Sequence, residues 1–213
     1  MGKVEKLAIF DIDGTLHVTA AMAIPAYQKV MPEFGFAPAS DEAIISSFGD
    51  NSEEILRKLG ISAPPDVIDA FNARMKIVDW EMMKERGQFY PGVMQTLARL
   101  KEAGIPMAVC SMCTENYRLQ IYEKFGIGEY MSGYRTEEWG DDKIVVLKSL
   151  LDEFQPERAV MVGDRFFDLR AARANGIPTI GCLYGYAPDE VRDAEYTVES
   201  ADELFDTILK ALT

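Results

Sequence analysis

The sequence predicts an α/β fold in which a core built on a parallel β-sheet is interrupted by an inserted all-helical cap domain. From Tyr90 onward, short apolar runs typical of buried strands alternate with amphipathic helical patterns, as in proteins with parallel sheets. Residues 7–10 form a similar apolar run near the N-terminus. Residues 18–86, between these two parts, have helical patterns only. We therefore expect residues 1–17 and 87–213 to form the core and residues 18–86 to form the cap.

The expected cap contains four helical segments. The first three are expected at residues 20–34, 41–48 and 53–59. Ser52 is the expected N-cap of the third, because acidic residues follow it in the first turn. Pro64 and Pro65 open the fourth and longest segment. Its apolar residues recur at steps of three and four, at Val67, Phe71, Met75, Val78 and Met82. Hinges to the core are expected at residues 17–19 and 87–88.

After the cap, strands and helices alternate. The further strands are expected at residues 106–110, 159–162, 178–182 and 196–198. A helix that begins near Val93 ends at Gly104, and Thr114 caps another that runs to Phe125. The remaining helices are expected at residues 143–154, 169–174 and 201–212.

Two aspartates follow the first strand. Asp11 and Asp13 are two positions apart, and this spacing places both side chains on the same side of an extended chain. Gly14 permits a sharp turn there, and Thr15 adds a hydroxyl group. Carboxylates this close repel each other unless a cation lies between them. The two carboxylates, the turn and the implied cation predict a metal-assisted phosphoryl-transfer site. The alternative interpretation is an acidic turn without a function.

Other polar residues follow the later strands. Ser111 ends the second strand, Asp164 and Asp168 follow the strand at residues 159–162, and Lys143 opens a helix. Since the carboxyl ends of parallel strands share one edge, these groups are expected to surround a phosphate and Mg²⁺. Each also has a structural interpretation, as a solvated lysine, a turn serine or an N-cap aspartate. Lysine in a first helical turn opposes the helix dipole, which favours a functional role.

Four motifs in order resemble the haloacid dehalogenase superfamily. They are the DxDGT motif at residues 11–15, Ser111 at a strand end, Lys143 at a helix start, and the GDxxxD motif at residues 163–168. The segment TIGCLYGYAPDE and the helical insertion resemble the phosphoglycolate phosphatase branch of that superfamily. The resemblance implies a Rossmann-like core. Met112 and Cys113 depart from the polar pair that often follows the serine.

The resemblance also implies residue roles and an activity. Asp11 would be the nucleophile that forms an aspartyl phosphate, and Asp13 the general acid and base. Ser111 and Lys143, with the Gly14–Thr15 turn, would bind the substrate phosphate. Mg²⁺ would be held by Asp11, the Asp13 backbone carbonyl and Asp164, with Asp168 as a supporting residue. The expected substrate is a small phosphorylated metabolite, either phosphoglycolate-like or a sugar phosphate.

Three other functions remain open at this stage. A phosphomutase of the β-phosphoglucomutase kind would pass the phosphoryl group to another sugar hydroxyl. A receiver-like signalling module also combines an aspartate, a hydroxyl, a lysine and Mg²⁺, although Asp13 and the helical insertion argue against it. A binding module without catalysis would leave all four motifs unexplained.

Composition restricts the partners and the compartment. The chain has 213 residues, of which 48% are hydrophobic, and a formal charge of −13. This charge argues against binding to nucleic acid, and no apolar run approaches the ~18 residues of a membrane span. Three cysteines and an N-terminus that leads directly into a strand favour the cytoplasm. The oligomeric state is not predicted.

Several further residues carry weaker hypotheses. Cys110 and Cys113 form a lone CxxC pattern, which is weak evidence for a redox role. His17, the single histidine, lies at the expected hinge. Asp50, Asn51 and Arg86 are candidates for substrate contact. Arg165 and Arg170 are candidates for pairing with the surplus acids, and Arg165 is near enough to Asp164 in the sequence to influence the site.

Overall fold

A computed structural model describes residues 3–213 and contains one six-stranded parallel sheet. The strands are β1 (Lys6–Phe10), β2 (Met107–Cys110), β3 (Met131–Arg135), β4 (Arg158–Gly163), β5 (Thr179–Cys182) and β6 (Tyr196–Val198). Their order is β3-β2-β1-β4-β5-β6. The first strand therefore lies near the centre, where Ile9 pairs with Ala108 on one side and with Met161 on the other. The predicted α/β fold with a parallel sheet is confirmed.

Helices cover both faces of the sheet. They are α5 (Val93–Glu102), α6 (Glu115–Phe125), α7 (Lys143–Phe154), α8 (Phe166–Ala174), α9 (Pro188–Val191) and α10 (Leu204–Ala211). Leu7 and Ile9 point to the face covered by α7 and α8, whereas Ala8 and Phe10 point to the face covered by α5 and α10. This alternation follows from the two-residue period of a strand, and burial on both faces explains the unbroken apolar run.

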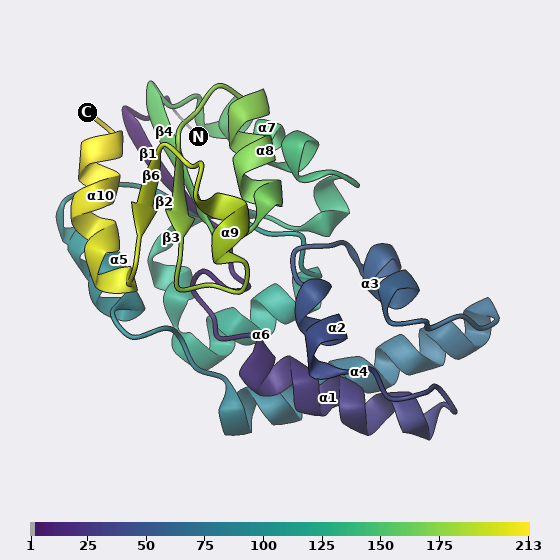
Figure 1. The fold of residues 1–213 in the computed structure, drawn as a ribbon. Coiled ribbons are helices and arrows are strands. Elements are labelled where there is room, and N and C mark those ends of the chain that lie inside the picture. The colour runs from purple at the N-terminus through teal and green to yellow at the C-terminus, as the bar shows by residue number, and fades with distance from the viewer. Residues whose placement is uncertain (1–2) are drawn as a thin grey trace.

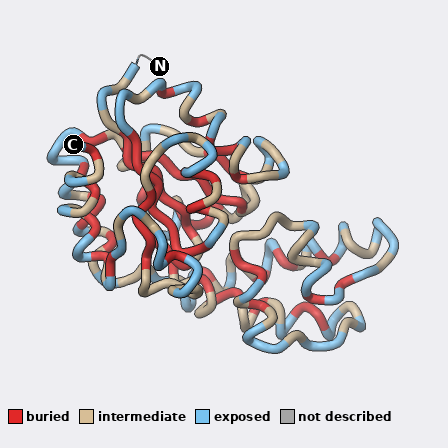
Figure 2. The backbone as a smooth tube through the Cα atoms, turned by 45° about the horizontal axis from the view of Figure 1, so that its top comes forward, coloured by how far each residue is buried: buried red, intermediate tan, exposed pale blue. Residues whose placement is uncertain are grey.

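Four helices lie between β1 and α5. They are α1 (Ala20–Glu33), α2 (Asp41–Ser46), α3 (Ser52–Lys58) and α4 (Pro65–Arg86). We call residues 20–86 the helical insertion. Figure 1 shows it beyond the edge of the sheet toward which the strands run, and the burial view shows fewer continuous buried stretches in it than in the sheet (Figure 2). The proposed domain boundaries beside this insertion remain a prediction.

The insertion helices follow the expected apolar pattern with small differences. In α4 the buried residues are Phe71, Met75, Val78 and Met83, so the apolar face ends at Met83 and not at Met82. The second helix ends at Ser46, two residues before the predicted end. Ser52 is the first residue of α3 and not its cap, because the Asn51 side chain accepts a hydrogen bond from the Glu54 amide.

Core elements also differ from the prediction: helix α9 was not expected, and α10 begins at Leu204 and not at residue 201. The sequence analysis located no strand between Gly126 and Lys143, where the structure has the edge strand β3. Helix α8 begins at Phe166 and not at residue 169. No helix within residues 3–213 combines the length and the apolar character needed to cross a membrane.

Candidate active site

The central strands bring two aspartates together at the carboxyl edge of the sheet. Phe10 pairs with Val162 in the register of β1 and β4, and the amide of Asp11 donates to the Val162 carbonyl at 2.9 Å. Asp164 follows the end of β4 by one residue. Both aspartates are buried. The strand pairing thus places two carboxylates in the same buried region, as the sequence predicts.

The turn after Asp11 is shaped by a close approach of Asp164. Gly14 has φ +73°, and a Cβ at this position would lie 2.2 Å from Asp164 Oδ2, so only glycine fits. The Thr15 hydroxyl donates to Asp164 Oδ1 at 3.5 Å, and the Tyr186 amide donates to Asp164 Oδ2 at 2.8 Å. Gly14 and Thr15 therefore position Asp164, and their predicted contact with a substrate phosphate remains a prediction.

Asp168 reaches the same region from the first turn of α8. Its Oδ2 accepts a hydrogen bond from the Arg165 amide at 3.1 Å, which satisfies one of the free amides at a helix start. Asp168 is thus the third residue of the helix, and the structural alternative that it is the N-cap does not hold. A Cβ on Gly163 would lie 2.1 Å from Asp168 Cγ. The position of the Asp168 side chain therefore requires a glycine at the end of β4.

Lys143 links two of the carboxylates. Its Nζ lies 2.7 Å from Asp11 Oδ1 and 2.6 Å from Asp168 Oδ1. Lys143 is buried, and burial alone lowers the pKa of a lysine. Here the charges of Asp11 and Asp168 outweigh burial and raise the pKa of Lys143 well above its usual value. Lys143 is therefore a buried cation at the start of α7.

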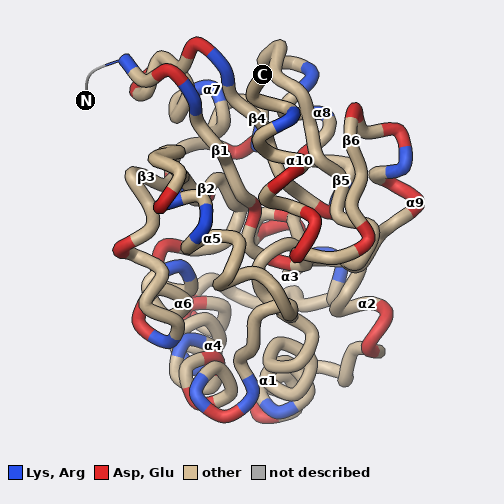
Figure 3. Tube along the Cα trace, turned by 90° about the vertical axis from the view of Figure 1, so that its left-hand side faces the viewer, with Lys and Arg blue, Asp and Glu red and all other residues tan. Residues whose placement is uncertain are grey.

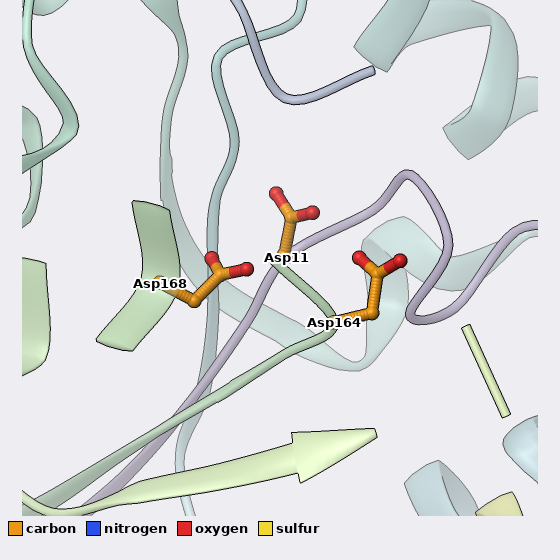
Figure 4. A group of neighbouring side chains, drawn as sticks. All are labelled: Asp11, Asp164 and Asp168. Atoms are coloured by element: carbon orange, nitrogen blue, oxygen red, sulfur yellow. The ribbon is translucent and has the colours of Figure 1, made fainter. Parts of the chain in front are cut away.

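Asp11, Asp164 and Asp168 form a candidate metal site. Each offers a carboxylate oxygen, and these oxygens lie within 4.8 Å of one another; Figure 4 shows the three carboxylates gathered around one space. Burial and the neighbouring charges of Asp11 and Asp168 raise the pKa of Asp164 well above its usual value. Lys143 neutralises only part of this charge, so a hard divalent cation with oxygen ligands fits the group.

Asp13 has a different environment from Asp11. It is half-buried, and its Oδ1 accepts hydrogen bonds from the Thr19 hydroxyl at 2.7 Å and from the Tyr117 hydroxyl at 3.1 Å. Burial and the charge of Asp11 raise the pKa of Asp13 to about 6. Its carboxylate is not among the cluster of Asp11, Asp164 and Asp168, so the two aspartates of the motif lie in separate environments.

Asp13 faces a cavity between the sheet edge and the helical insertion. This cavity has a volume of about 130 Å³. The core contributes Met112, Cys113 and Thr114 from the loop after β2, next to the buried Ser111. The insertion contributes residues from α1, α3, α4 and the loop after α2. A group bound beside Asp13 would therefore be enclosed by the insertion.

Three residues around the site were not found by sequence reasoning. Thr19 and Tyr117 hold Asp13, and Tyr186 joins Asp164 to the insertion because its hydroxyl accepts from the Ala20 amide at 2.7 Å. Thr19 carried a partial signal, since it lies in the predicted hinge. Tyr186 lies in the segment TIGCLYGYAPDE that carries the family resemblance, but no role was assigned to it. Tyr117 had no signal, because a tyrosine on a helix is usually a packing residue.

The weaker hypotheses have mixed outcomes. Asp50 lines the cavity, whereas Asn51 caps α3. Arg86 pairs with Glu85 on the surface and is absent from the lining of the cavity.

Arg165 and Arg170 pair with acids outside the site. Arg165 is bound to Glu190 at 3.0 Å, and Arg170 is bound to Asp142 at 2.8 Å. Neither arginine pairs with a carboxylate of the site, but the charge of Arg165 partly offsets the burial and the neighbouring carboxylates that raise the pKa of Asp164.

The single histidine and the cysteines are buried or partly buried. His17 is buried among Phe89, Tyr117 and Phe125, which fits its expected place at the junction of core and insertion. Cys110 and Cys113 are free thiols. Burial raises the pKa of Cys110 to about 12, so it is a poor nucleophile at neutral pH.

The chain belongs to the haloacid dehalogenase-like hydrolase family, whose model matches residues 8–182. It is 29% identical over 189 residues to a phosphoglycolate phosphatase from Agrobacterium fabrum, which covers 84% of this chain and 81% of the relative. It is also 29% identical over 218 residues to the tyrosine-protein kinase PtkA from Mycobacterium tuberculosis, covering 99% of this chain and 74% of the relative.

The fold also matches solved structures. A predicted phosphoglycolate phosphatase from Haemophilus somnus superposes with a TM-score of 0.86 at 19% identity, covering 95% of this chain and 97% of that chain. Together with the family match, these relatives identify an enzyme of the phosphatase type. The predicted family resemblance and the predicted enzyme class are confirmed.

Proposed function

We propose that the chain is a Mg²⁺-dependent phosphatase that hydrolyses a small phosphorylated metabolite through an aspartyl phosphate on Asp11. The observation that carries this proposal is the contact of Lys143 with both Asp11 and Asp168, beside a separate, half-buried Asp13. The buried Lys143 cation and the acid–base group Asp13, both near the Asp11 carboxylate, suit the two steps of phosphoryl transfer.

Each residue has a proposed part. Asp11 attacks phosphorus and displaces the alcohol, and a water molecule then hydrolyses the aspartyl phosphate. Lys143 and Ser111 bind the equatorial phosphoryl oxygens, where the charge of the transition state is spread. Asp13 gives a proton to the leaving oxygen and later takes one from the attacking water. Its pKa of about 6 is close to neutral pH, which suits both transfers.

The metal has proposed ligands and one task. Asp11, Asp164 and the Asp13 backbone carbonyl would hold Mg²⁺, and Asp168 would keep Lys143 in place. Bound there, Mg²⁺ supplies positive charge that lets an anionic phosphate approach the Asp11 carboxylate.

Transfer to an acceptor other than water is the second candidate. It is favoured by the match to a chain named as a tyrosine-protein kinase across 99% of this sequence. A phosphomutase would use the same intermediate. The test uses a phosphate ester with a radiolabelled phosphoryl group. If the label moves to a second sugar or to a tyrosine peptide without release of inorganic phosphate, the function is transfer and not hydrolysis.

The test compares Asp11→Asn with Asp13→Asn by rapid quench, in the presence of Mg²⁺. We expect no phosphoenzyme and no product from Asp11→Asn. Asp13→Asn should slow an alkyl phosphate by ~10²–10⁴, because a poor leaving group needs its proton. Asp13→Asn should still give a burst with p-nitrophenyl phosphate, because this leaving group scarcely needs a proton, and slow turnover should follow the burst.

Two outcomes would contradict these roles. A burst from Asp11→Asn would assign the nucleophile to another residue. Equal loss of both substrates in Asp13→Asn, with no burst, would remove Asp13 from proton transfer.

A further inference from the structure

The cavity beside Asp13 has a one-sided charge. Within residues 3–213, its charged lining residues are Asp13, Asp50 and Asp79, and no lysine or arginine lines it. If Asp13 protonates the leaving oxygen, as proposed above, the alcohol part of the substrate lies in this cavity. The chemistry of its wall therefore selects the alcohol.

The two acids of the insertion differ in how they are neutralised. Asp50 is ion-paired with Lys58. Asp79, on α4, is half-buried and has no ion pair within the described part of the chain. Burial raises the pKa of Asp79 to about 7. Asp79 is thus the acid of this wall whose charge is least balanced by protein groups.

Neighbouring groups do not supply the missing cation. Tyr27 lines the same cavity, and burial together with the charges of Asp79 and Asp13 raises the pKa of its phenol, which stays a neutral donor. An adjoining cavity of about 500 Å³ shares Tyr27 and Asp79. Its charged lining is Lys76, Asp79, Glu115, Glu137 and Glu138. Lys76 is exposed, so acids dominate this cavity too.

We propose that Asp79 selects phosphate esters whose alcohol part donates hydrogen bonds and disfavours those that carry a carboxylate, such as 2-phosphoglycolate. The proposal rests on the proposed phosphatase activity and assigns its substrate class. A carboxylate in this cavity would face Asp79 without a cation, and like charges repel strongly where water is scarce. Hydroxyl or ammonium groups would instead donate to the Asp79 carboxylate.

The experiment measures kcat/KM in Mg²⁺ for three esters of similar size: glycerol 3-phosphate, O-phosphoethanolamine and 2-phosphoglycolate. It is carried out at a pH of about 8.5, where Asp79, whose pKa burial raises to about 7, is a carboxylate. The first two esters separate a hydroxyl donor from an ammonium donor. We expect the wild type to prefer one of them over 2-phosphoglycolate by about tenfold or more. Asp79→Asn, which removes the charge and keeps the shape, should lose most of this preference, while Asp79→Glu should retain it.

Asp69→Asn is the matched control. Asp69 lies on the same helix and is exposed, so this change should leave the preference unaltered. A far-UV circular dichroism spectrum that matches that of wild type shows that Asp79→Asn is folded. If the wild type accepts 2-phosphoglycolate at least as well as the other two, this inference is wrong and the proposed function stands. If it hydrolyses no ester, the proposed function itself is wrong.

Discussion

At the scale of single residues, the two aspartates of the first motif are distinguished by their partners. Asp11 is bound by the Lys143 ammonium at 2.7 Å, whereas Asp13 is bound by two hydroxyl groups. An ammonium stabilises an anion more strongly than a neutral hydroxyl does. The two aspartates therefore have different partners, a charged donor at Asp11 and neutral donors at Asp13.

His17 gives a prediction for acid stability. Burial lowers the pKa of His17 from 6.5 to about 3. Between these pH values the unfolded chain binds a proton that the folded protein does not, so stability from the neutral ring is complete above about pH 6.5 and falls as the pH decreases. The raised pKa values of Asp13 and Asp79 act in the opposite direction.

A His17→Phe variant separates these effects. Asp79 does not contact His17, so it contributes equally to both proteins. The difference between the unfolding free energies of the two proteins reports His17 together with its contacts to the Thr19 and Tyr117 hydroxyls. We expect wild type to lose up to about 1.4 kcal/mol per pH unit relative to the variant below pH about 6.5. Urea titrations at pH about 7 and about 5 measure this difference. Parallel pH dependence of the two proteins would contradict a neutral buried His17.

Sequence reasoning located the charged residues of the site and the hydroxyl residues Thr15 and Ser111. It did not find the roles of Thr19, Tyr117 and Tyr186. Asp11, Lys143 and Asp164 were predictable because strand ends and helix starts place them. The contact of Tyr186 with Asp164 was not, since a loop residue reaches it across 22 positions of the chain. Such contacts depend on tertiary packing, which periodicity does not encode.

At the scale of elements, predictability follows burial. Helix α7 has the predicted bounds because its apolar face and the Asp142 cap both mark them. Strand β3 was missed because it is an edge strand that includes Gly133 and is only partly buried, so it lacks an apolar run. The start of helix α8 was predicted three residues too late. Its first turn contains Asp168, which points to the site, and therefore lacks the apolar periodicity that marks a helix.

Polar contacts add to apolar packing in holding the helical insertion against the core. Glu137, in the short 3-10 helix at Glu137–Trp139, accepts hydrogen bonds from the Ser52 amide at 2.8 Å and from the Ser52 hydroxyl at 2.6 Å. Ser52 lines the cavity beside Asp13. The Gln120 amide also donates to the Lys76 carbonyl at 3.1 Å. Glu137 therefore stabilises the closed arrangement next to the candidate substrate site.

Glu137→Ala should weaken this closure. Loss of two hydrogen bonds costs about 1–3 kcal/mol, so we expect KM to rise by about 5- to 100-fold for an alkyl phosphate. The phosphoenzyme burst with saturating p-nitrophenyl phosphate should persist, because the site residues are unchanged.

Glu138→Ala is the control for Glu137→Ala. Glu138 is exposed on the same 3-10 helix and accepts its hydrogen bond from the Glu115 amide of the core. Its KM should stay within about twofold of wild type. An unchanged KM in Glu137→Ala would mean that the contact with Ser52 does not stabilise the substrate-bound form.

At the scale of the whole molecule, the parallel sheet explains why distant motifs form one site. The residues that match the four motifs lie between positions 11 and 168, and the sheet collects them at one edge. The parallel pairing of the strands could be expected from the alternation of strands and helices, but their order, which includes the edge strand β3, was not predicted. The contacts of α4 with α6 and with the cavity could not be expected from the sequence, because helix amphipathicity identifies a buried face but not its partner.

The chain has a net charge of −13, and the buried carboxylate cluster is the costly part of that charge. Acidic and basic segments are interspersed over the surface (Figure 3), where solvent screens them. The carboxylates of Asp11, Asp164 and Asp168 are instead buried and close together. Their repulsion should destabilise the metal-free fold, and a bound cation should remove that cost.

Thermal unfolding tests this at the level of the whole protein, without an activity assay. Mg²⁺ at about 100 times its Kd stabilises the fold by about 2.7 kcal/mol, which raises Tm by about 5–10 °C for a chain of this size. EDTA should reverse the shift, and NaCl of equal ionic strength should not reproduce it. Asp164→Asn should unfold at a higher temperature than wild type in EDTA, because it removes one repelling charge, and should respond little to Mg²⁺. Asp141→Asn, an exposed change of equal charge, should keep the full response. A Tm insensitive to Mg²⁺ in the wild type would contradict metal binding by this cluster.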